Sequence, residues 1–275
     1  MNSDKKEGTK EAGHCPSPVA KTPFLAEILP GRRLVEFNVA LENVPGALEA
    51  VASVMRTHNV NVISGFHNTE RWSFFADITD ANAPPDKLLS EVNSLGIVTS
   101  VHAADGSDFL IDFFHFPFLW EGQRMVIMRA ELLSAILDQV REIFRSVGTV
   151  SKLLVFDMGK AAGHSMSKIV TENVGSSDLS IPFSGLMNVY SALGWGIFKL
   201  TAIDPERSVA RVRVGENFEC LFHKGDHGSC YSEFVRGHLA ALFSDLFRKD
   251  VTAVESECLA RGDQFCVFNL QPKHP

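Results

Sequence analysis

Apolar and polar residues alternate through the first half of the chain in short segments separated by turns. Residues 34–41, Leu-Val-Glu-Phe-Asn-Val-Ala-Leu, have the two-residue period of a half-buried strand, whereas the apolar residues of 47–58 share one face of a helix. The pattern that follows predicts a second helix at 86–95 and strands at 59–66, 72–78 and 97–103. The order βαββαβ predicts a ferredoxin-like sandwich.

Longer amphipathic segments begin near Glu121 and precede two pairs of strands. Helices are predicted at 130–147, where Gly148 is a stop signal, and at 181–193 and 231–247. Residues 150–157 are apolar and 159–170 are weakly helical. Strands are predicted at 123–129, 198–203, 209–214, 251–259 and 265–270, with 216–222 as a further candidate. We therefore predict an α+β chain whose second domain is α/β, with an antiparallel sheet packed on helices.

Composition shifts along the chain predict the domain boundaries. Residues 1–32 are rich in Lys, Glu, Ser, Gly and Pro and predict a disordered tail. The first domain is predicted at 33–106 and the second at 121–272. Between them, 107–120 contains five Phe and one Trp, which favours a strand and connector buried between domains over a membrane contact.

Charge and hydropathy exclude several classes of protein. The chain has 275 residues and a formal net charge of −7, which is a poor basis for binding nucleic-acid phosphates. No apolar run is long enough to span a membrane, and residues 1–21 lack the apolar segment of a secretory signal. These features predict a cytoplasmic protein. Its 21 Phe against 2 Tyr favour a dry interior or an apolar pocket.

Four of the five cysteines lie in the last third of the chain, which favours a metal site or redox chemistry over disulfides. Glu255 and Glu257 lie just before Cys258 in the sequence. Two or three thiolates with one of these carboxylates could form a tetrahedral Zn²⁺ site. Glu255 and Cys258 are three positions apart and would point to opposite faces of a flat strand. Joint ligation therefore requires a bulge, and buried thiols that serve only as packing are the alternative.

The loop between the first predicted strand and helix reads Asn43-Val44-Pro45-Gly46-Ala47-Leu48. With its flanking elements, this loop resembles the Asp/Asn-x-Pro-Gly-x-Leu motif of ACT domains, over about residues 34–104. The resemblance implies a small effector, often an amino acid, bound where the loop meets a dimer partner. Gly46 would let the ligand approach the backbone, and the helix N-terminus would offer N–H groups to a carboxylate. The alternatives are a simple tight turn and a domain that only dimerises.

A second resemblance rests on Cys230 before a Gly-containing helix, Glu255-Ser-Glu-Cys258, the Gly262-Asp turn and Cys266-Val-Phe268. These elements are similar to the 4-vinyl reductase domain, which is also the ligand-sensing domain of bacterial activators that respond to phenols and toluenes. The similarity extends over 121–270. In those sensors the matching residues bind zinc. By position this implies a structural zinc on Cys230, Glu255, Cys258 and Cys266, with Glu257 as the substitute carboxylate and Cys220 outside the signature.

The resemblance also implies a hydrophobic ligand pocket between helices and sheet. Val214 stands where phenol sensors carry an aromatic residue, which disfavours phenol as the ligand. The alternative is that these aromatic side chains only fill a core. The candidate lining residues are Phe183, Met187, Tyr190, Trp195, Phe198, Phe218 and Phe234.

No phosphate loop, dinucleotide fingerprint or Ser-His-Asp set is recognisable in the sequence, and His223 and His227 are predicted to be solvated. We therefore predict a non-catalytic, homodimeric regulator that binds a small hydrophobic molecule and carries a structural zinc. Two alternatives remain open: an enzyme or accessory factor in tetrapyrrole vinyl reduction, and a dimeric assembly scaffold like related vesicle-tethering subunits.

Overall fold

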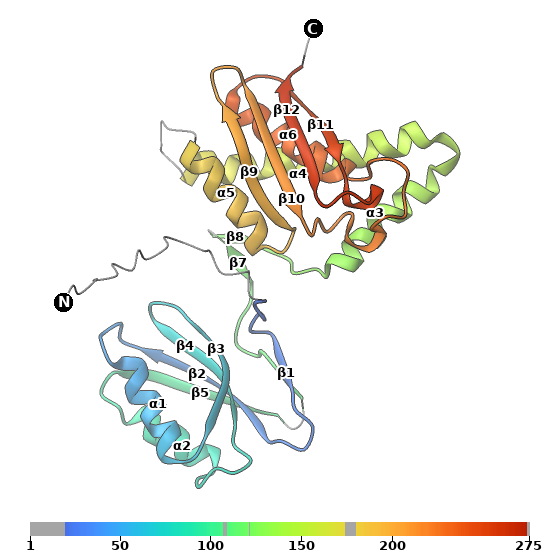
Figure 1. Ribbon diagram of the computed structural model, residues 1–275. Coiled ribbons are helices and arrows are strands. Elements are labelled where there is room, and N and C mark those ends of the chain that lie inside the picture. Colours follow the sequence, from blue (N-terminus) through green and yellow to red (C-terminus); the bar gives the residue numbers. More distant parts are fainter. Residues whose placement is uncertain (1–19, 107–108, 121, 174–179, 274–275) are drawn as a thin grey trace, which may run out of the picture. The chain divides into compact units, whose positions relative to one another are not determined.

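The computed structural model describes residues 20–106, 109–120, 122–173 and 180–273 (Figure 1). The chain divides into two compact units, residues 1–125 and residues 126–275. We call them the N-terminal unit and the C-terminal unit.

The N-terminal unit has the predicted βαββαβ order, and its four-stranded antiparallel sheet has the strand order β3-β4-β2-β5. Side chains from one face of this sheet, among them Val35, Phe37 and Phe74, form a core with α1 and α2. The elements are β2 (Leu34–Leu41), α1 (Ala47–Thr57), β3 (Asn61–His67), β4 (Arg71–Asp77), α2 (Pro85–Asn93) and β5 (Val98–Gly106).

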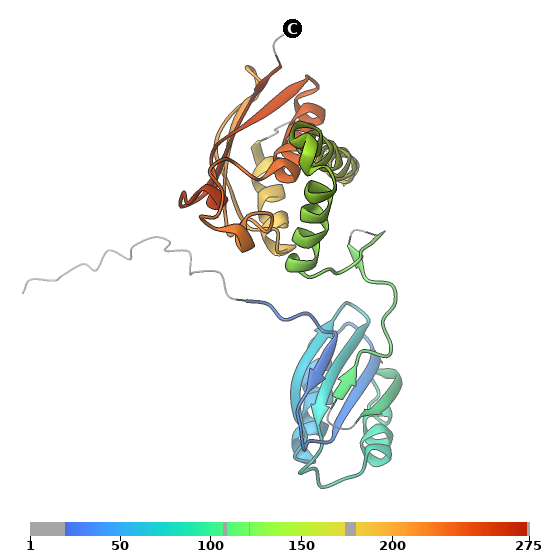
Figure 2. The same ribbon diagram turned by 90° about the vertical axis from the view of Figure 1, so that its right-hand side faces the viewer.

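The other face of this sheet is covered by two short strands, of which the sequence predicted only the second, as a strand within the Phe-rich segment. β1 (Ala26–Ile28) pairs antiparallel with β6 (Phe109–Ile111) (Figure 2). Leu110 packs on Leu34 and Phe75. β1 lies within the segment expected to be a disordered tail. Each strand has only three residues, too few to show a period, and its order comes from this packing. A hairpin of β7 (Leu119–Trp120) and β8 (Gln123–Arg124) follows.

The C-terminal unit packs its helices on one side of an antiparallel sheet with the order β11-β12-β10-β9 (Figure 2). This arrangement agrees with the predicted fold class. The elements are α3 (Ala130–Ile143), α4 (Gly148–Asn173), α5 (Ser180–Ala192), β9 (Ile197–Asp204), β10 (Val209–Gly215), α6 (Glu233–Phe247), β11 (Val251–Glu257) and β12 (Cys266–Pro272).

Helix α4 is the main departure from the predicted elements. Gly148 was expected to stop a helix, but α4 begins at this residue after a short 3₁₀ turn at Arg145–Val147. The glycines inside α4 serve close packing: a Cβ added to Gly159 would lie 2.0 Å from the carbonyl oxygen of Phe234 in α6. Gly237 of α6 makes the reciprocal approach, where an added Cβ would lie 2.0 Å from the carbonyl oxygen of Phe156.

Residues 216–222 do not extend the sheet. After β10 the chain turns through a positive φ of 50° at Glu216 and ends in a 3₁₀ turn at Leu221–His223. The turn directs the side chain of Cys220 into the interior, where it is fully buried. Among the described residues, the helices are all too short or too polar to cross a membrane.

Candidate metal centre and apolar interior

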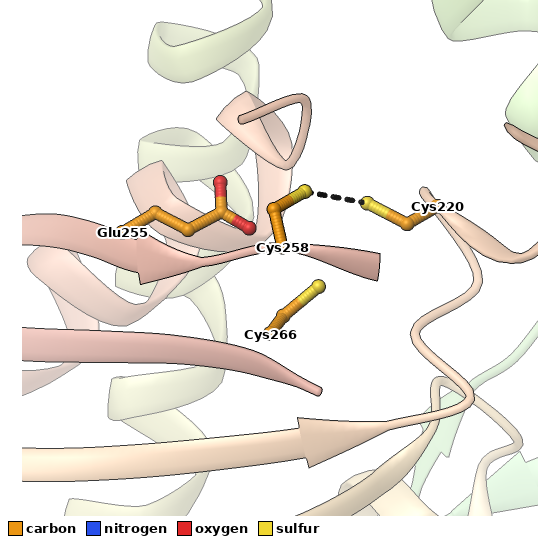
Figure 3. Close-up of side chains that lie close together, drawn as sticks. All are labelled: Cys220, Glu255, Cys258 and Cys266. Carbon is orange, nitrogen blue, oxygen red and sulfur yellow. Dashed lines mark hydrogen bonds between the residues drawn. The ribbon is translucent and has the colours of Figure 1, made fainter. Parts of the chain in front are cut away.

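Four potential metal ligands from separate parts of the C-terminal unit meet in one cluster (Figure 3). They are Cys220 from the turn after β10, Glu255 from β11, Cys258 just after β11 and Cys266 at the start of β12. One ligand atom of each lies within 4.8 Å of the others. We call these residues the Cys₃Glu cluster.

A bulge in β11 brings Glu255 and Cys258 to the same side. Glu255 pairs with Phe268 and Glu257 with Val267, so the pairing between β11 and β12 shifts register at Ser256. An extra residue of this kind turns the following side chains to the other face. The sequence predicted that joint ligation requires such an irregularity.

The sulfur geometry fits a tetrahedral metal. Cys220 Sγ lies 3.6 Å from Cys258 Sγ. Two thiolates at a Zn–S distance of about 2.3 Å in a tetrahedron are separated by about 3.8 Å. The free thiols therefore already stand near the spacing that zinc would impose.

Hydrogen-bond donors point at two of the sulfurs. The backbone N–H of Tyr231 donates to Cys258 Sγ at 3.4 Å, and that of Leu259 donates to Cys266 Sγ at 3.4 Å. Hydrogen bonds from Cys220 and Cys266, with the Tyr231 N–H, outweigh burial and lower the pKa of the Cys258 thiol. Because the thiolate is the form that binds metals, these contacts prepare Cys258 for ligation.

Ser232 connects the members of the cluster. Its hydroxyl donates to Glu255 Oε1 at 2.8 Å and lies 2.9 Å from Cys220 Sγ. Burial, with the nearby Cys258, raises the pKa of Glu255 to about 9, because no positive charge among the described residues compensates the carboxylate form. A bound cation would supply that charge.

The cluster differs from the expected ligand set at one position. Cys230 Sγ lies 3.5 Å from the carbonyl oxygen of Glu255 and outside the group, and burial raises the pKa of this thiol to about 11. Cys220, which lies outside the family signature, occupies the position in the cluster that was expected for Cys230. Of the two carboxylates, Glu255 faces the sulfurs, whereas Glu257 is 3.8 Å from Arg211 on a half-exposed surface.

The residues expected to line a hydrophobic pocket belong to one buried cluster of the C-terminal unit. Tyr190 is central, with ring centroids 5.4 Å from Trp195 and 5.1 Å from Phe198. Trp195 in turn contacts Phe218 and Phe234, at 5.5 Å and 5.9 Å. Phe183 packs elsewhere in the cluster, stacked on Phe243 at 4.6 Å, and Met187 is 1% exposed.

A polar pair lies within this aromatic shell. The Tyr190 hydroxyl is 2.6 Å from His238 Nε2, and both side chains are essentially inaccessible. His238 Nδ1 has no hydrogen-bond partner among the described residues. Burial lowers the pKa of His238 to about 3, so the imidazole is neutral. His238 was not among the pocket residues predicted from the sequence.

In the N-terminal unit, the loop Asn43–Leu48 borders a surface hollow of about 350 Å³. Gly46 has a φ of 86° and precedes the first residue of α1. A left-handed conformation of this kind favours glycine. Leu41, Glu42, Glu49 and His67 complete the lining of the hollow.

The side chains of His223 and His227 border a second hollow of about 620 Å³ beside α3. His223 Nε2 lies 2.8 Å from Asp138 Oδ2, and the Tyr231 hydroxyl donates to Asp138 Oδ1 at 2.7 Å. Against the effect of burial, these two contacts lower the pKa of Asp138. His223 is thus held by Asp138, although the sequence predicted a solvated side chain.

Residues 210–272 match the family model of the 4-vinyl reductase domain. The match spans β10, the Cys₃Glu cluster, α6 and the closing hairpin. It confirms the resemblance to this family for these residues, whereas the ACT-like character of the N-terminal unit remains a prediction. No functionally curated protein matches the chain.

Several solved structures resemble part of the chain at low identity. The phenol-responsive sensory domain of the transcription activator PoxR, with phenol, is 18% identical with a TM-score of 0.48, over 56% of this chain and 79% of that one. A vinyl-4-reductase family protein from Methanocaldococcus jannaschii is 16% identical with a TM-score of 0.32. The match covers 55% of this chain and 99% of that chain. A trafficking protein particle complex subunit 3 from Naegleria fowleri, covalently bound to palmitic acid, is 14% identical with a TM-score of 0.40. The match covers 53% of this chain and 95% of that chain. At these values the likenesses assign no function.

Proposed function

We propose that the protein is a small-molecule sensor whose C-terminal unit binds a hydrophobic ligand in its aromatic interior. The observation that carries the proposal is the Tyr190–His238 pair, enclosed by Trp195 and Phe198 in the unit that contains the family match. Aromatic surface with a few placed polar groups is the usual composition of a small-molecule site. The ligand is therefore a small apolar molecule with one polar group.

The polar pair gives this site its selectivity. A buried polar group without a partner costs about 1–3 kcal/mol, and His238 Nδ1 is such a group among the described residues. A ligand hydroxyl can accept a hydrogen bond from a protonated Nδ1 or donate to a bare Nδ1, according to the tautomer of the imidazole, and would remove this cost. A ligand without a polar group would not. Rearrangement of the Tyr190 ring would supply the volume for such a ligand.

The Cys₃Glu cluster supports the site as a structural zinc centre in our proposal. Cys220, Glu255, Cys258 and Cys266 would hold the ion, and Ser232 would orient Glu255. The ion would tie the turn after β10 to both strands of the closing hairpin. Because Phe218 lies two residues before Cys220 and Phe234 two residues after Ser232, the same contacts would stiffen the wall of the aromatic interior.

Thermal-shift measurements with a panel of apolar compounds, in matched hydroxylated and unsubstituted pairs, test the proposed function. We expect members of the hydroxylated set to raise the melting temperature of the wild type. His238→Phe keeps the volume and removes the hydrogen bond, so it should abolish the preference for hydroxylated compounds. A wild type that no apolar compound stabilises, and that yields no apolar compound on solvent extraction, would contradict the proposal.

A second binding role is proposed for the N-terminal unit because of the hollow beside Asn43–Leu48. An amino-acid-like effector would place its carboxylate at the N-terminus of α1. Gly46→Val would strain the backbone and block this approach, and should abolish stabilisation by amino acids without changing the zinc content. If none of the twenty amino acids stabilises the wild type, this role is excluded.

A further inference from the structure

A second group of potential metal ligands lies in the N-terminal unit, on the sheet face opposite its helices. Glu36 is in the middle of β2, and Asp112 and His115 follow β6. One ligand atom of each residue lies within 4.8 Å of the others. We call these residues the Glu-Asp-His cluster.

The contacts within this cluster leave one buried oxygen without a partner. His115 Nδ1 is 2.7 Å from Asp112 Oδ1 and 4.0 Å from Glu36 Oε1. The backbone N–H of Phe113 donates to Glu36 Oε2 at 2.8 Å. Among the described residues, Glu36 Oε1 has no hydrogen-bond partner, although the Glu36 side chain is 0% exposed. A cation would stabilise an orphaned carboxylate oxygen that faces an imidazole nitrogen and a second carboxylate.

Fixed positive charge does not compensate these carboxylates. Among the described residues, Glu36 and Asp112 form ion pairs only with His115, and no Lys or Arg reaches either of them. Two carboxylates this close repel each other unless a proton or a metal ion lies between them. A divalent ion would neutralise both and use the orphaned oxygen.

We infer that Glu36, Asp112 and His115 bind a divalent transition-metal ion, with zinc as the best fit. The donor set of one imidazole nitrogen and two carboxylate oxygens disfavours Mg²⁺ and Ca²⁺, which take oxygen ligands. Ligands at about 2.1 Å from a tetrahedral zinc are about 3.4 Å apart, which small side-chain rotations reach from the observed spacing. His115 is 26% exposed, so an ion can approach this residue from solvent.

The neighbouring side chains form the support that a metal-bound histidine requires. With Nδ1 on the metal, His115 Nε2 carries the proton and donates to Ser73 Oγ, which lies at 3.0 Å. Asn38 Nδ2 also donates to Ser73 Oγ, at 2.8 Å, and Arg71 donates to the Asn38 side-chain carbonyl. Ser73 is therefore a positioning residue for the metal ligand.

The same contacts resemble a Ser-His-Asp relay, but burial excludes that use. Ser73 is 0% exposed and lies in β4 under the segment that carries His115. A substrate carbonyl could not reach its hydroxyl without removal of that segment. Metal binding needs only the accessible edge of His115 and therefore agrees with the geometry.

The site would attach the start of the connector to the sheet. Asp112 and His115 are the first polar residues after β6, and the N–H of Asp112 donates to the carbonyl of Leu25 at 2.9 Å. A metal shared with Glu36 would fix this segment to the centre of β2. Loss of the metal would detach the segment that carries Asp112 and His115 from Glu36, while the β1–β6 pairing remained.

Metal titration of the full-length protein tests this inference, with readouts that separate it from the Cys₃Glu cluster. Chelator-treated, reduced protein is titrated with Zn²⁺ by calorimetry and with Co²⁺ by absorption. Thiolate ligands give Co²⁺ an intense charge-transfer band, whereas imidazole and carboxylate ligands do not. We expect the wild type to bind one ion that produces the band and one that does not.

His115→Ala and Asp112→Asn should each lose the ion without the band and keep the other. Loss of a supporting partner weakens metal binding by about 10–100-fold, so Ser73→Ala should reduce the Zn²⁺ affinity of this site by a factor in that range. Loss of a ligand should reduce the affinity by more. His102→Ala, which removes an exposed histidine of the same sheet, is the matched control and should bind as the wild type does. Cys258→Ser should lose only the ion with the band.

If His115→Ala fails to fold, the isosteric Asp112→Asn decides the test. The number of ions that the wild type binds is itself a test and requires no variant. A wild type that binds a single ion with the full thiolate band would overturn the inference. So would equal Zn²⁺ binding by the wild type and Asp112→Asn. Either result would mean that Glu36 and Asp112 share a proton in place of a metal.

Discussion

Cys220 and Cys230 show how far a single residue's role can be predicted from the sequence. The signature around Cys258 and Cys266 correctly located the region of the cluster, and the need for a bulge followed from strand geometry alone. The third cysteine was assigned to Cys230 from its position in the family signature, which does not include Cys220. Only the fold shows that the turn after β10 aims Cys220 at Cys258, 3.6 Å away.

Substitution of the two cysteines separates the alternatives. Cys220→Ser should lose about one zinc per chain and destabilise the C-terminal unit, because metal binding and folding are coupled. Cys230→Ser should keep the metal, since its sulfur points to a backbone carbonyl. Elemental analysis of the two purified variants measures this difference. The opposite result would restore the ligand set expected from the family signature.

His238 gives the C-terminal unit a defined pH dependence. Its pKa of about 3 in the folded state lies below the ordinary value of 6.5, so the unfolded chain takes up a proton first as the pH falls. The free energy of unfolding therefore decreases from about pH 6.5 down to pH 3. Between pH 7.5 and 5.5 this amounts to about 1.4 kcal/mol.

Urea unfolding of the wild type and His238→Phe at these two pH values measures the contribution. From pH 7.5 to 5.5, the free energy of unfolding of the wild type should fall by about 1.4 kcal/mol more than that of the variant. Other titrating groups, including the metal ligands, are common to both proteins and cancel in the comparison. An equal loss in the two proteins would show that His238 is not buried as a neutral base.

At the scale of elements, the alternation of residues 34–106 was sufficient to predict the N-terminal sheet and its two helices. Helix α4 was not predicted as one element, because Gly148, Gly159 and Gly163 are helix-stop or helix-weakening signals. Their cost is offset by contact with α6, which no local pattern shows. β1 was missed for the same reason, since it depends on a partner distant in sequence.

The α4–α6 contact predicts a large effect from a single methyl group. Gly237→Ala places a Cβ 2.0 Å from the carbonyl oxygen of Phe156, and backbone cannot yield as a side chain can. We expect a loss of at least about 3 kcal/mol in the free energy of unfolding. Gly185→Ala in α5, where an added Cβ meets nothing within 4 Å, should instead stabilise by about 0.4–1 kcal/mol. Urea unfolding of both variants measures these changes, and a tolerated Gly237→Ala would contradict the close helix packing.

At the scale of the whole molecule, exposed apolar side chains predict self-association. Ile136, Ile143, Val147 and Leu153 are 41%, 64%, 52% and 58% exposed along α3, the following turn and α4. Apolar patches of this kind mark interaction surfaces. We therefore expect a homodimer in solution, as the sequence predicted.

Light scattering at micromolar concentration measures the mass of the assembly. Ile143→Glu should shift a dimer to the monomer. Val254→Glu, which places the same charge at an exposed apolar residue of β11, is the control and should leave the dimer intact. A monomeric wild type would contradict the predicted dimer without affecting the ligand site.

Native mass spectrometry of the full-length protein, purified without chelators, tests the central claim most directly. The account predicts that the C-terminal unit carries both a structural zinc and a small apolar molecule. The spectrum should show each chain with at least one zinc and with an organic adduct that solvent extraction releases. Cys258→Ser should carry one zinc fewer than the wild type. A chain with the bare polypeptide mass, unchanged after incubation with zinc and with the hydroxylated apolar panel, would contradict it.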